Sequence, residues 1–274
     1  MNPTAEEMFA QADQLPQIPK VMQEVVASLR NEDVSFSELA ALVHNDPVIS
    51  ANVLRLANSS YYGVGRNVAN ISQAINLIGL TAFRNRVIAS SLSRTFTRAG
   101  NIDLADFWRN SMLVANLAHI IGQNLDRDRE MLFSAGLMHG IGQLLINICL
   151  PDAALAFSGR VIDVPIQEMR NEERALFQTD HFEVGMELVR RWNFPECIQT
   201  AIGHYDCPAD DDLPAQVVHV AYLIAKGIQG SLPIADLLGE ISPDILERLH
   251  LDKEWFEEKG EVFDLLMDES FALV

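Results

Sequence analysis

Apolar residues recur along most of the chain at spacings of three and four positions, which is the period of an amphipathic α-helix. No segment shows the strict alternation of apolar and polar residues that is typical of a half-buried strand. The pattern therefore predicts an all-α protein. The expected helices cover residues 4–13, 18–30, 36–44, 47–57, 71–78, 80–97, 103–124, 129–148, 151–158, 166–177, 181–192, 195–204, 214–228, 243–249 and 253–268.

Capping residues mark several of the expected helix starts. Asp46 followed by Pro47 supplies an N-cap and a first-turn proline. Ser242 followed by Pro243 repeats that order. Two further starts have the spacing of a capping box, in which an acid three residues after the cap bonds back to it. These pairs are Ser35 with Glu38 and Asp180 with Glu183.

The longest apolar run, Leu137 to Leu150, is shorter than a membrane span and is interrupted by His139, Gln143 and Asn147. It is typical of a buried core helix. The first residues lack the basic segment and apolar segment of a signal peptide. The three cysteines form no CxxC pair, which fits reduced thiols. We therefore expect a cytoplasmic protein that does not enter a membrane.

The composition is globular, and the net charge argues against one class of partner. Hydrophobic residues make up 49% of the 274 residues and charged residues 21%, which allows a substantial core. The formal net charge is −18, so we expect no nucleic-acid binding by the surface as a whole. Residues 229–274 alone hold 12 acidic and 3 basic side chains.

Arginines gather in the middle of the chain, where they outnumber the nearby aspartates. Such an excess could face an anion, and the alternative is a solvated or salt-bridged helix face. The arginines are Arg84, Arg86, Arg94, Arg98, Arg109 and Arg127.

The last expected helix, residues 253–268, has one apolar side and one acidic side. It either docks on its own domain or binds a partner or a second copy of the chain. Its apolar residues are Trp255, Phe256, Val262, Phe263, Leu266 and Met267.

Two stretches of the sequence resemble one known family. The first starts with residues 15–19, LPQIP, continues with residues 46–63, DPVISANVLRLANSSYYG, and ends with residues 71–79, ISQAINLIG. In order and spacing this resembles the N-terminal half of the HDOD family, the HD-related output domain of bacterial signalling proteins.

The second stretch resembles the histidine-bearing half of the same family. It begins at residues 107–111, FWRNS, passes through Met138-His139-Gly140, and continues with residues 180–185, DHFEVG, and residues 192–195, WNFP. His204 and Tyr205 end it. The resemblance implies an all-helical, two-lobed fold related to the HD and HD-GYP metal hydrolases. It also implies a non-catalytic role in signal output, as is general in this family.

The resemblance places a degenerate metal pocket in the second half. The His-Asp pair that holds a divalent metal in active relatives corresponds to His139 and Gly140, and glycine has no ligating side chain. The first ligand His corresponds to Asn110 and the final Asp to Tyr222. The lysine that follows the pair corresponds to Gln143.

The histidines that bind further metals in HD-GYP enzymes correspond to His181 and His204, with Tyr205 in place of the second His of a His-His pair. Three histidines, these two and His139, are enough to hold one zinc ion. Each also has a structural explanation, His139 within an apolar helix, His181 at a helix start and His204 near a helix end. We expect no catalytic residue, no metal and no cofactor.

Polar and aromatic groups also gather at the end of the helix that covers residues 47–57. Arg55, Asn58, Ser59, Tyr61 and Tyr62 would suit a recognition surface. The alternative is helix termination, with the Asn and Ser side chains bonding free backbone groups.

From the resemblance we expect an N-terminal helical extension at residues 1–14 and an HDOD domain at residues 15–228. The domain would consist of an N-terminal lobe, residues 15–97, and an HD-like lobe, residues 98–228. An acidic helical extension at residues 229–274 would follow.

The predicted function is a non-catalytic regulatory or scaffold module of bacterial signal transduction. We expect it to act on a signalling protein in trans, because no receiver or cyclase domain accompanies it, and a homodimer stays open. One alternative is a divergent metal-dependent phosphohydrolase that uses the three histidines and a divalent metal. The other is a nucleotide or anion sensor that uses the degenerate pocket or the arginine-rich stretch.

Overall fold

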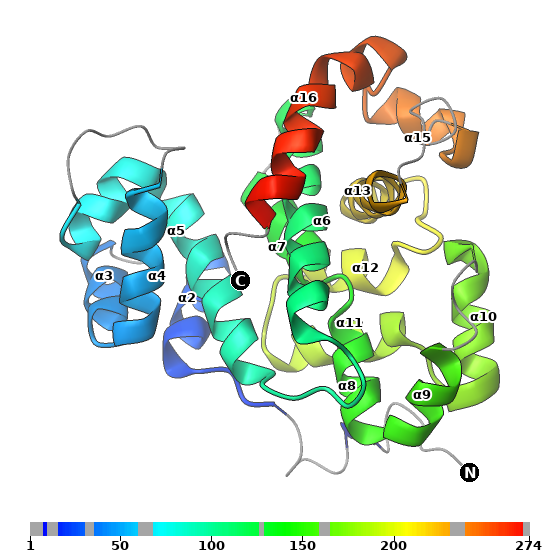
Figure 1. Ribbon diagram of the computed structural model, residues 1–274, viewed down its shortest axis with the longest axis horizontal. Helices are drawn as coiled ribbons and strands as arrows, with labels where there is room; N and C mark the ends of the chain where they lie inside the picture. The colour runs from blue at the N-terminus through cyan, green and yellow to red at the C-terminus, as the bar shows by residue number, and fades with distance from the viewer. Residues whose placement is uncertain are drawn as a thin grey trace. The chain divides into compact units, whose positions relative to one another are not determined.

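The computed structural model describes residues 8–9, 16–30, 36–59, 68–125, 129–158, 165–230 and 239–270. These residues form helices joined by short connections and include no strand, so the fold is all-α as the hydrophobic pattern predicts (Figure 1). The helices are α2 (Lys20–Arg30), α3 (Phe36–His44), α4 (Pro47–Ala57), α5 (Ile71–Thr95), α6 (Leu104–Asn124), α7 (Arg129–Met138), α8 (Ile141–Cys149), α9 (Pro151–Ser158), α10 (Ile166–Phe177), α11 (His181–Arg191), α12 (Glu196–His204), α13 (Leu213–Gln229), α15 (Pro243–Arg248) and α16 (Lys253–Ser270).

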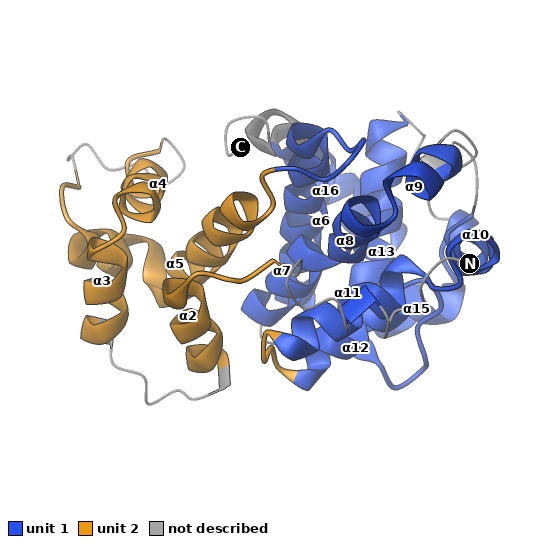
Figure 2. Cartoon of the chain, turned by 90° about the horizontal axis from the view of Figure 1, so that it is seen from below, with its two compact units in different colours: residues 1–15, 98–191, 196–274 blue, residues 16–97, 192–195 orange. Residues whose placement is uncertain are grey.

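The chain divides into two compact units (Figure 2). The small unit consists of residues 16–97 and 192–195. The large unit consists of residues 1–15, 98–191 and 196–274. The small unit therefore includes a four-residue segment that lies almost 100 positions beyond its main part in the sequence.

Trp192 ties this short segment to the rest of the small unit. Its indole N–H donates a hydrogen bond to the carbonyl of Pro16 over 3.2 Å. Its ring lies against Phe96, with 6.2 Å between the ring centroids. The expected helix over residues 181–192 ends one residue earlier, at Arg191, which frees Trp192 to reach the small unit.

In the small unit, α4 begins as the sequence predicts. Asp46 is its N-cap, and Oδ1 of Asp46 accepts hydrogen bonds from the backbone N–H groups of Val48 and Ile49, each over 3.1 Å. The other carboxylate oxygen of Asp46 pairs with Arg94 of α5 at 2.6 Å. One aspartate thus starts α4 and also links it to α5.

The two helices expected at residues 71–78 and 80–97 form one element, α5, that is interrupted at Gly79. Gly79 has φ 86° and ψ 153°, a backbone conformation that is essentially restricted to glycine. The sequence therefore located the break correctly, while the helix ends at Thr95 rather than residue 97.

In the large unit, the single helix expected over residues 129–148 is wrong. The chain forms α7, leaves the helical path at His139 and Gly140, and resumes as α8. The imidazole Nδ1–H of His139 donates to the carbonyl of Gly136 over 2.7 Å, which occupies an acceptor at the end of α7. His139 thus lies in a turn between two helices and not inside one.

The same stretch, Arg129–Cys149, passes a test for a membrane span by length and composition, but 78% of its apolar window is buried inside the protein. A core helix of a folded protein passes the same test. The segment is buried because α7 packs against α6 and α8 packs against α11. A Cβ atom on Gly142 would lie only 2.0 Å from the carbonyl oxygen of His181, so only glycine fits there.

Two capping predictions need correction. Ser242 precedes α15, but its side chain makes no capping bond, and its carbonyl alone accepts from the N–H groups of Ile245 and Leu246. Asp180 does accept the backbone N–H of Glu183 over 2.8 Å, but the Glu183 side chain lies near Arg174 instead. Ser35 and most of the expected helix at residues 4–13 lie outside the described residues.

The apolar side of α16 docks within the large unit, where α16 packs against α6. Trp255, Phe256 and Phe263 are buried, and the ring centroids of Phe256 and Phe263 are 6.5 Å apart. Val262 and Leu266 are half-buried, and the Met267 side chain lies outside the described residues. The structure therefore favours the docked interpretation of this helix over a free partner-binding face.

Candidate functional site

Four of the eight residues assigned to the pocket meet in the core of the large unit, and we call them the histidine–tyrosine cluster. They are His139, His181, Tyr205 and Tyr222. The ring of His139 lies 5.5 Å from that of Tyr205 and 5.8 Å from that of Tyr222, centroid to centroid. The two tyrosine rings are 5.7 Å apart. The cluster thus brings together one residue each from the α7–α8 turn, from α11, from the position directly after α12, and from α13.

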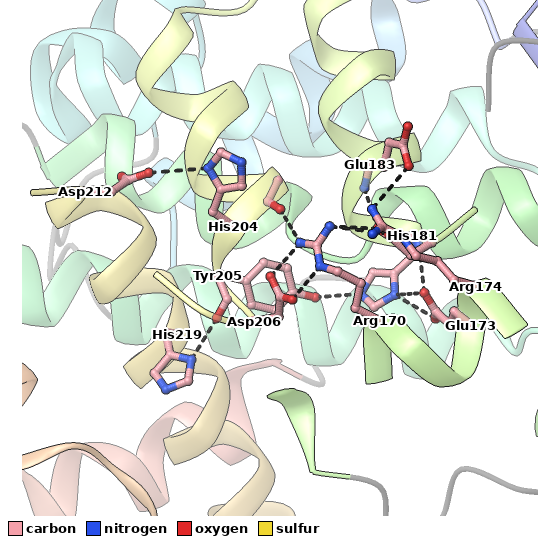
Figure 3. A network of polar contacts seen from close by, with 12 residues as sticks. Arg170, Glu173, Arg174, His181, Glu183, His204, Tyr205, Asp206, Asp212 and His219 are labelled. Atoms are coloured by element: carbon pink, nitrogen blue, oxygen red, sulfur yellow. Dashed lines mark hydrogen bonds and ion pairs between the residues drawn. The ribbon is translucent and has the colours of Figure 1, made fainter. Parts of the chain in front are cut away.

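A buried hydrogen-bonded chain runs from Glu173 through His181 to Tyr205 (Figure 3). Nδ1 of His181 lies 2.7 Å from each carboxylate oxygen of Glu173, and Nε2 lies 2.9 Å from the Tyr205 hydroxyl. A carboxylate only accepts, so we assign the proton to Nδ1 and let the Tyr205 O–H donate to Nε2. Both ring nitrogens of His181 are therefore occupied.

Burial disfavours the charged forms of three cluster residues, His139, Tyr205 and Tyr222. It lowers the pKa of His139 to about 4, although the hydrogen bond to Gly136 opposes the shift. Burial likewise raises the pKa of Tyr205 and of Tyr222 above the usual value for a phenol. Near neutral pH, His139 is thus a neutral imidazole and both phenols keep their protons.

An arginine-centred ion-pair network adjoins the cluster (Figure 3). Arg170 of α10 holds Asp206 through two hydrogen bonds of 2.6 Å and contacts Asp180 at 3.3 Å. Its guanidinium also donates to the carbonyl of Gly203 and lies 4.8 Å from the ring centroid of Phe182. Arg174 pairs with the other side of Asp180 at 2.6 Å. These bonds neutralise two buried carboxylates and tie α10 to α11 and α12.

Sequence reasoning missed Arg170, Glu173 and Asp206. One signal for Glu173 was present, because the buried positions of α10 are Ile166, Met169, Glu173 and Phe177, at helical spacing. An acid within such an apolar stripe requires a buried partner, here His181. Nothing in the sequence near Asp206 indicated that it would pair with Arg170, 36 positions away.

The other pocket residues lie apart from the cluster or have other partners. The ring of His204 is half exposed, and its Nδ1 lies 3.8 Å from Oδ2 of Asp212. Figure 3 shows His204 beside Asp212 and apart from His181. The side chain of Asn110 accepts a hydrogen bond from Gln229. A Cβ atom on Gly140 would lie 3.2 Å from the ring of Phe107 and 3.8 Å from the Gln143 side chain, so Phe107 borders the place of the expected aspartate.

The donor set does not fit a metal ion. Within the described ranges, no group of three or more His, Cys, Asp or Glu residues is arranged to hold one. His139 and His181 are near each other, but His204 is not with them, and both nitrogens of His181 are already bonded. The nearby carboxylates of Glu173, Asp180 and Asp206 are held by His181 and by the two arginines.

The proposed recognition surface is partly explained by helix termination. The side chain of Asn58 donates to the carbonyls of Leu54 and Val68 and accepts from the N–H of Val68, over 2.8 to 2.9 Å. Asn58 therefore closes the loop after α4. Arg55 is exposed and Ser59 half-buried. Tyr61 and Tyr62 lie outside the described residues.

A helical protein with two compact units and a buried histidine–tyrosine cluster is the class that this fold and site define. The model of the HDOD domain matches residues 15–208, and the chain belongs to the HDOD family, as its motifs indicate. A protein of Treponema pallidum (strain Nichols), described as uncharacterized, is 27% identical over 235 residues. That alignment covers 81% of this chain and 44% of the relative, so the chain spans less than half of that protein's length.

Two solved structures are similar over nearly the whole chain. One is a protein from Shewanella amazonensis SB2B described as a "putative phosphohydrolase", with 27% identity, a TM-score of 0.78, and coverage of 96% of this chain and 97% of that one. The other is an HDOD domain protein with unknown function from Geobacter sulfurreducens, with 23% identity, a TM-score of 0.82, and coverage of 98% and 97%. The second likeness shows the fold alone.

Proposed function

We propose that this protein is a non-catalytic regulatory module of bacterial signal transduction that acts in the cytoplasm on a signalling protein in trans. The observation that carries the proposal is the Tyr205 hydroxyl bonded to Nε2 of His181. That nitrogen is the one a metal would need, since Nδ1 is bonded to Glu173. Both ring nitrogens of His181 thus have hydrogen-bond partners within the chain.

The energetics of the cluster support a structural role. His139, His181 and Tyr205 are each no more than 2% exposed, so a substrate has no direct access to them. Buried polar groups that are fully bonded stabilise one packing of their helices, and breaking such a network is costly. The cluster and the Arg170 network together would keep α10, α11, α12 and α13 in a fixed arrangement, which suits a module that presents a surface.

The rival function is a divergent metal-dependent phosphohydrolase, and one observation favours it. The similar Shewanella protein bears a phosphohydrolase description. A hydrolase of this kind uses a metal to acidify a water molecule and to bind the phosphoryl oxygens. In this chain such a metal would have to displace Tyr205 from His181 and draw His204 into the cluster.

Metal content and hydrolysis, measured on one preparation, decide between the two functions. We expect protein purified without a chelator or histidine tag to hold far less than one metal ion per chain. We also expect no hydrolysis of bis(4-nitrophenyl) phosphate above background with added Mn²⁺ or Zn²⁺, and no change in Tm with EDTA.

The outcome that would overturn the proposal is a metal-dependent rate that is lost in His181→Gln and kept in a matched control. His44→Gln provides that control, because His44 is exposed at the end of α3, in the small unit. Loss of the rate in both variants would instead indicate a contaminating activity.

A further inference from the structure

Polar pairs define the register of the seam between α4 and α5 in the small unit. Asp46 pairs with Arg94 at 2.6 Å, and the side-chain amide of Asn52 donates to the Ser90 hydroxyl over 3.2 Å. As residue numbers rise along α4, their partners' numbers fall along α5, so the helices run antiparallel. The next step of this register, one turn further along each helix, brings Arg55 opposite Arg86.

This third step differs from the other two because both of its residues are cations. Arg86 is 6% exposed, and its Nε is buried without a hydrogen-bond acceptor in the described part of the chain. Burial and, to a lesser extent, the charge of Arg55 together lower the pKa of Arg86 to about 10. Among the described residues, no carboxylate opposes either effect. A buried guanidinium without a counter-charge is unfavourable, and a bound anion would offset that cost.

Two other arginines of the stretch differ from Arg86 in having a carboxylate partner. Arg94 has Asp46 and Arg109 has Asp106 as a carboxylate partner. The sequence that connects α4 to α5, residues 58–70, contains no Asp or Glu. Within the arginine-rich stretch, Arg94 and Arg109 are therefore salt-bridged, whereas Nε of Arg86 has no acceptor among the described residues.

We propose that Arg55 and Arg86 form a binding site for a phosphoryl group on the α4–α5 seam of the small unit. Two guanidinium groups match the charge of a phosphate monoester, which is close to −2 at neutral pH. A single carboxylate would leave one of the two charges uncompensated. Asn52 supports the site, since its Oδ1 lies 3.4 Å from Nη2 of Arg55 and limits where that side chain points.

The site is separate from the histidine–tyrosine cluster, which belongs to the large unit. Nothing in the proposal depends on whether that cluster regulates or hydrolyses. The site would let the chain bind a phosphorylated small molecule or free phosphate through Arg86, which is buried in the small unit.

Thermal unfolding in phosphate and in chloride of equal ionic strength tests the site. Because a ligand that binds only the folded state raises Tm, we expect inorganic phosphate at a few times its Kd to raise Tm by about 2–4 °C over chloride. Acetate is the carboxylate probe and should give a smaller rise. Adenosine 5′-monophosphate compared with adenosine shows whether a phosphate ester is accepted as well as the free ion.

Three variants complete the design. Arg86→Met keeps the buried stem and removes the charge, so it should raise Tm in chloride and abolish the rise in phosphate. Arg55→Gln alters an exposed side chain and should lose the phosphate rise while the fold is kept. Arg98→Gln removes one exposed positive charge elsewhere and should keep the full rise.

Arg55→Gln decides the matter even if Arg86→Met fails to fold. A phosphate rise that persists in Arg55→Gln would overturn the proposal. So would the absence of any rise in the wild type, or an equal rise with acetate.

Discussion

His139 shows how one residue in this protein depends on its surroundings. Its side chain is buried, donates to the carbonyl of Gly136, and lies edge-on to Tyr205 and Tyr222. Its neighbour His181 adds an unfavourable interaction with any positive charge on it. The imidazole is therefore stable in the core only while it is neutral.

The first prediction concerns acid. The pKa of His139 is about 4 in the folded protein and near 6.5 when unfolded, so the unfolded state binds more protons between these values. The contribution of His139 to the free energy of unfolding is fully present above pH 6.5 and is lost as the pH falls toward 4. At one pKa unit per 1.36 kcal/mol, the loss is roughly 2 kcal/mol at pH 5 and about 3 kcal/mol at pH 4.

Urea unfolding of the wild type and of His139→Gln at pH 7.5 and pH 5 measures this effect. The free energy of unfolding should fall less in the variant, by roughly 2 kcal/mol, since glutamine does not titrate. His44→Gln, at an exposed position, is the control and should fall as much as the wild type. An equal fall in all three proteins would show that His139 is not the group responsible.

At the scale of an element, α5 shows a glycine that is required by backbone conformation and not by space. Nothing lies within 4 Å of the place where a Cβ atom on Gly79 would be. Its φ of 86° and ψ of 153° are nevertheless a conformation that residues other than glycine adopt only with backbone strain. The interruption allows residues 71–78 and 80–95 to follow different axes within one element.

The second prediction is that Gly79→Ala destabilises the protein by about 1–3 kcal/mol, because alanine has to adopt a strained backbone. Gly260 of α16 also has nothing within 4 Å of its Cβ position and provides the matched control. Gly260→Ala should stabilise by up to about 1 kcal/mol, since glycine is a poor helix former. Urea unfolding followed by circular dichroism gives both values. Equal effects of the two substitutions would contradict the role of Gly79.

At the scale of the whole molecule, the small unit is completed by a segment from a distant part of the sequence. Residues 192–195 follow α11 of the large unit, yet Trp192 packs with Phe96 and bonds to Pro16. The unit is therefore not a continuous stretch of chain, and a fragment that ends at residue 97 would lack part of its core.

The third prediction tests this completion. Trp192 is 9% exposed, so Trp192→Ala should lower the free energy of unfolding by about 3–5 kcal/mol, as expected for loss of a buried aromatic ring. Trp192→Phe keeps most of the ring and loses the N–H bond to Pro16, so we expect a loss of about 1 kcal/mol. Circular dichroism in urea reports both. A negligible effect of the alanine variant would show that residues 192–195 do not contribute to the small unit.

The sequence by itself determined the helical fold class, most helix positions, the Asp46 cap, the break at Gly79 and the family. The family follows from the order and spacing of motifs along the chain, whereas the other features rest on interactions between residues a few positions apart, such as the 3.6-residue period and the bonds of a cap. The same local signals failed at His139 and Gly140, where an apolar run of helical period is divided by a turn.

Only the tertiary structure decided the content of the candidate site. It brought Glu173, His181 and Tyr205 into one hydrogen-bonded chain, and it placed His204 outside that chain beside Asp212. It also placed Arg86 opposite Arg55, with no acceptor for its Nε in the described ranges. A buried polar group takes its partner from whichever helix packs against it, and helix packing depends on the whole chain, so no local pattern specifies that partner.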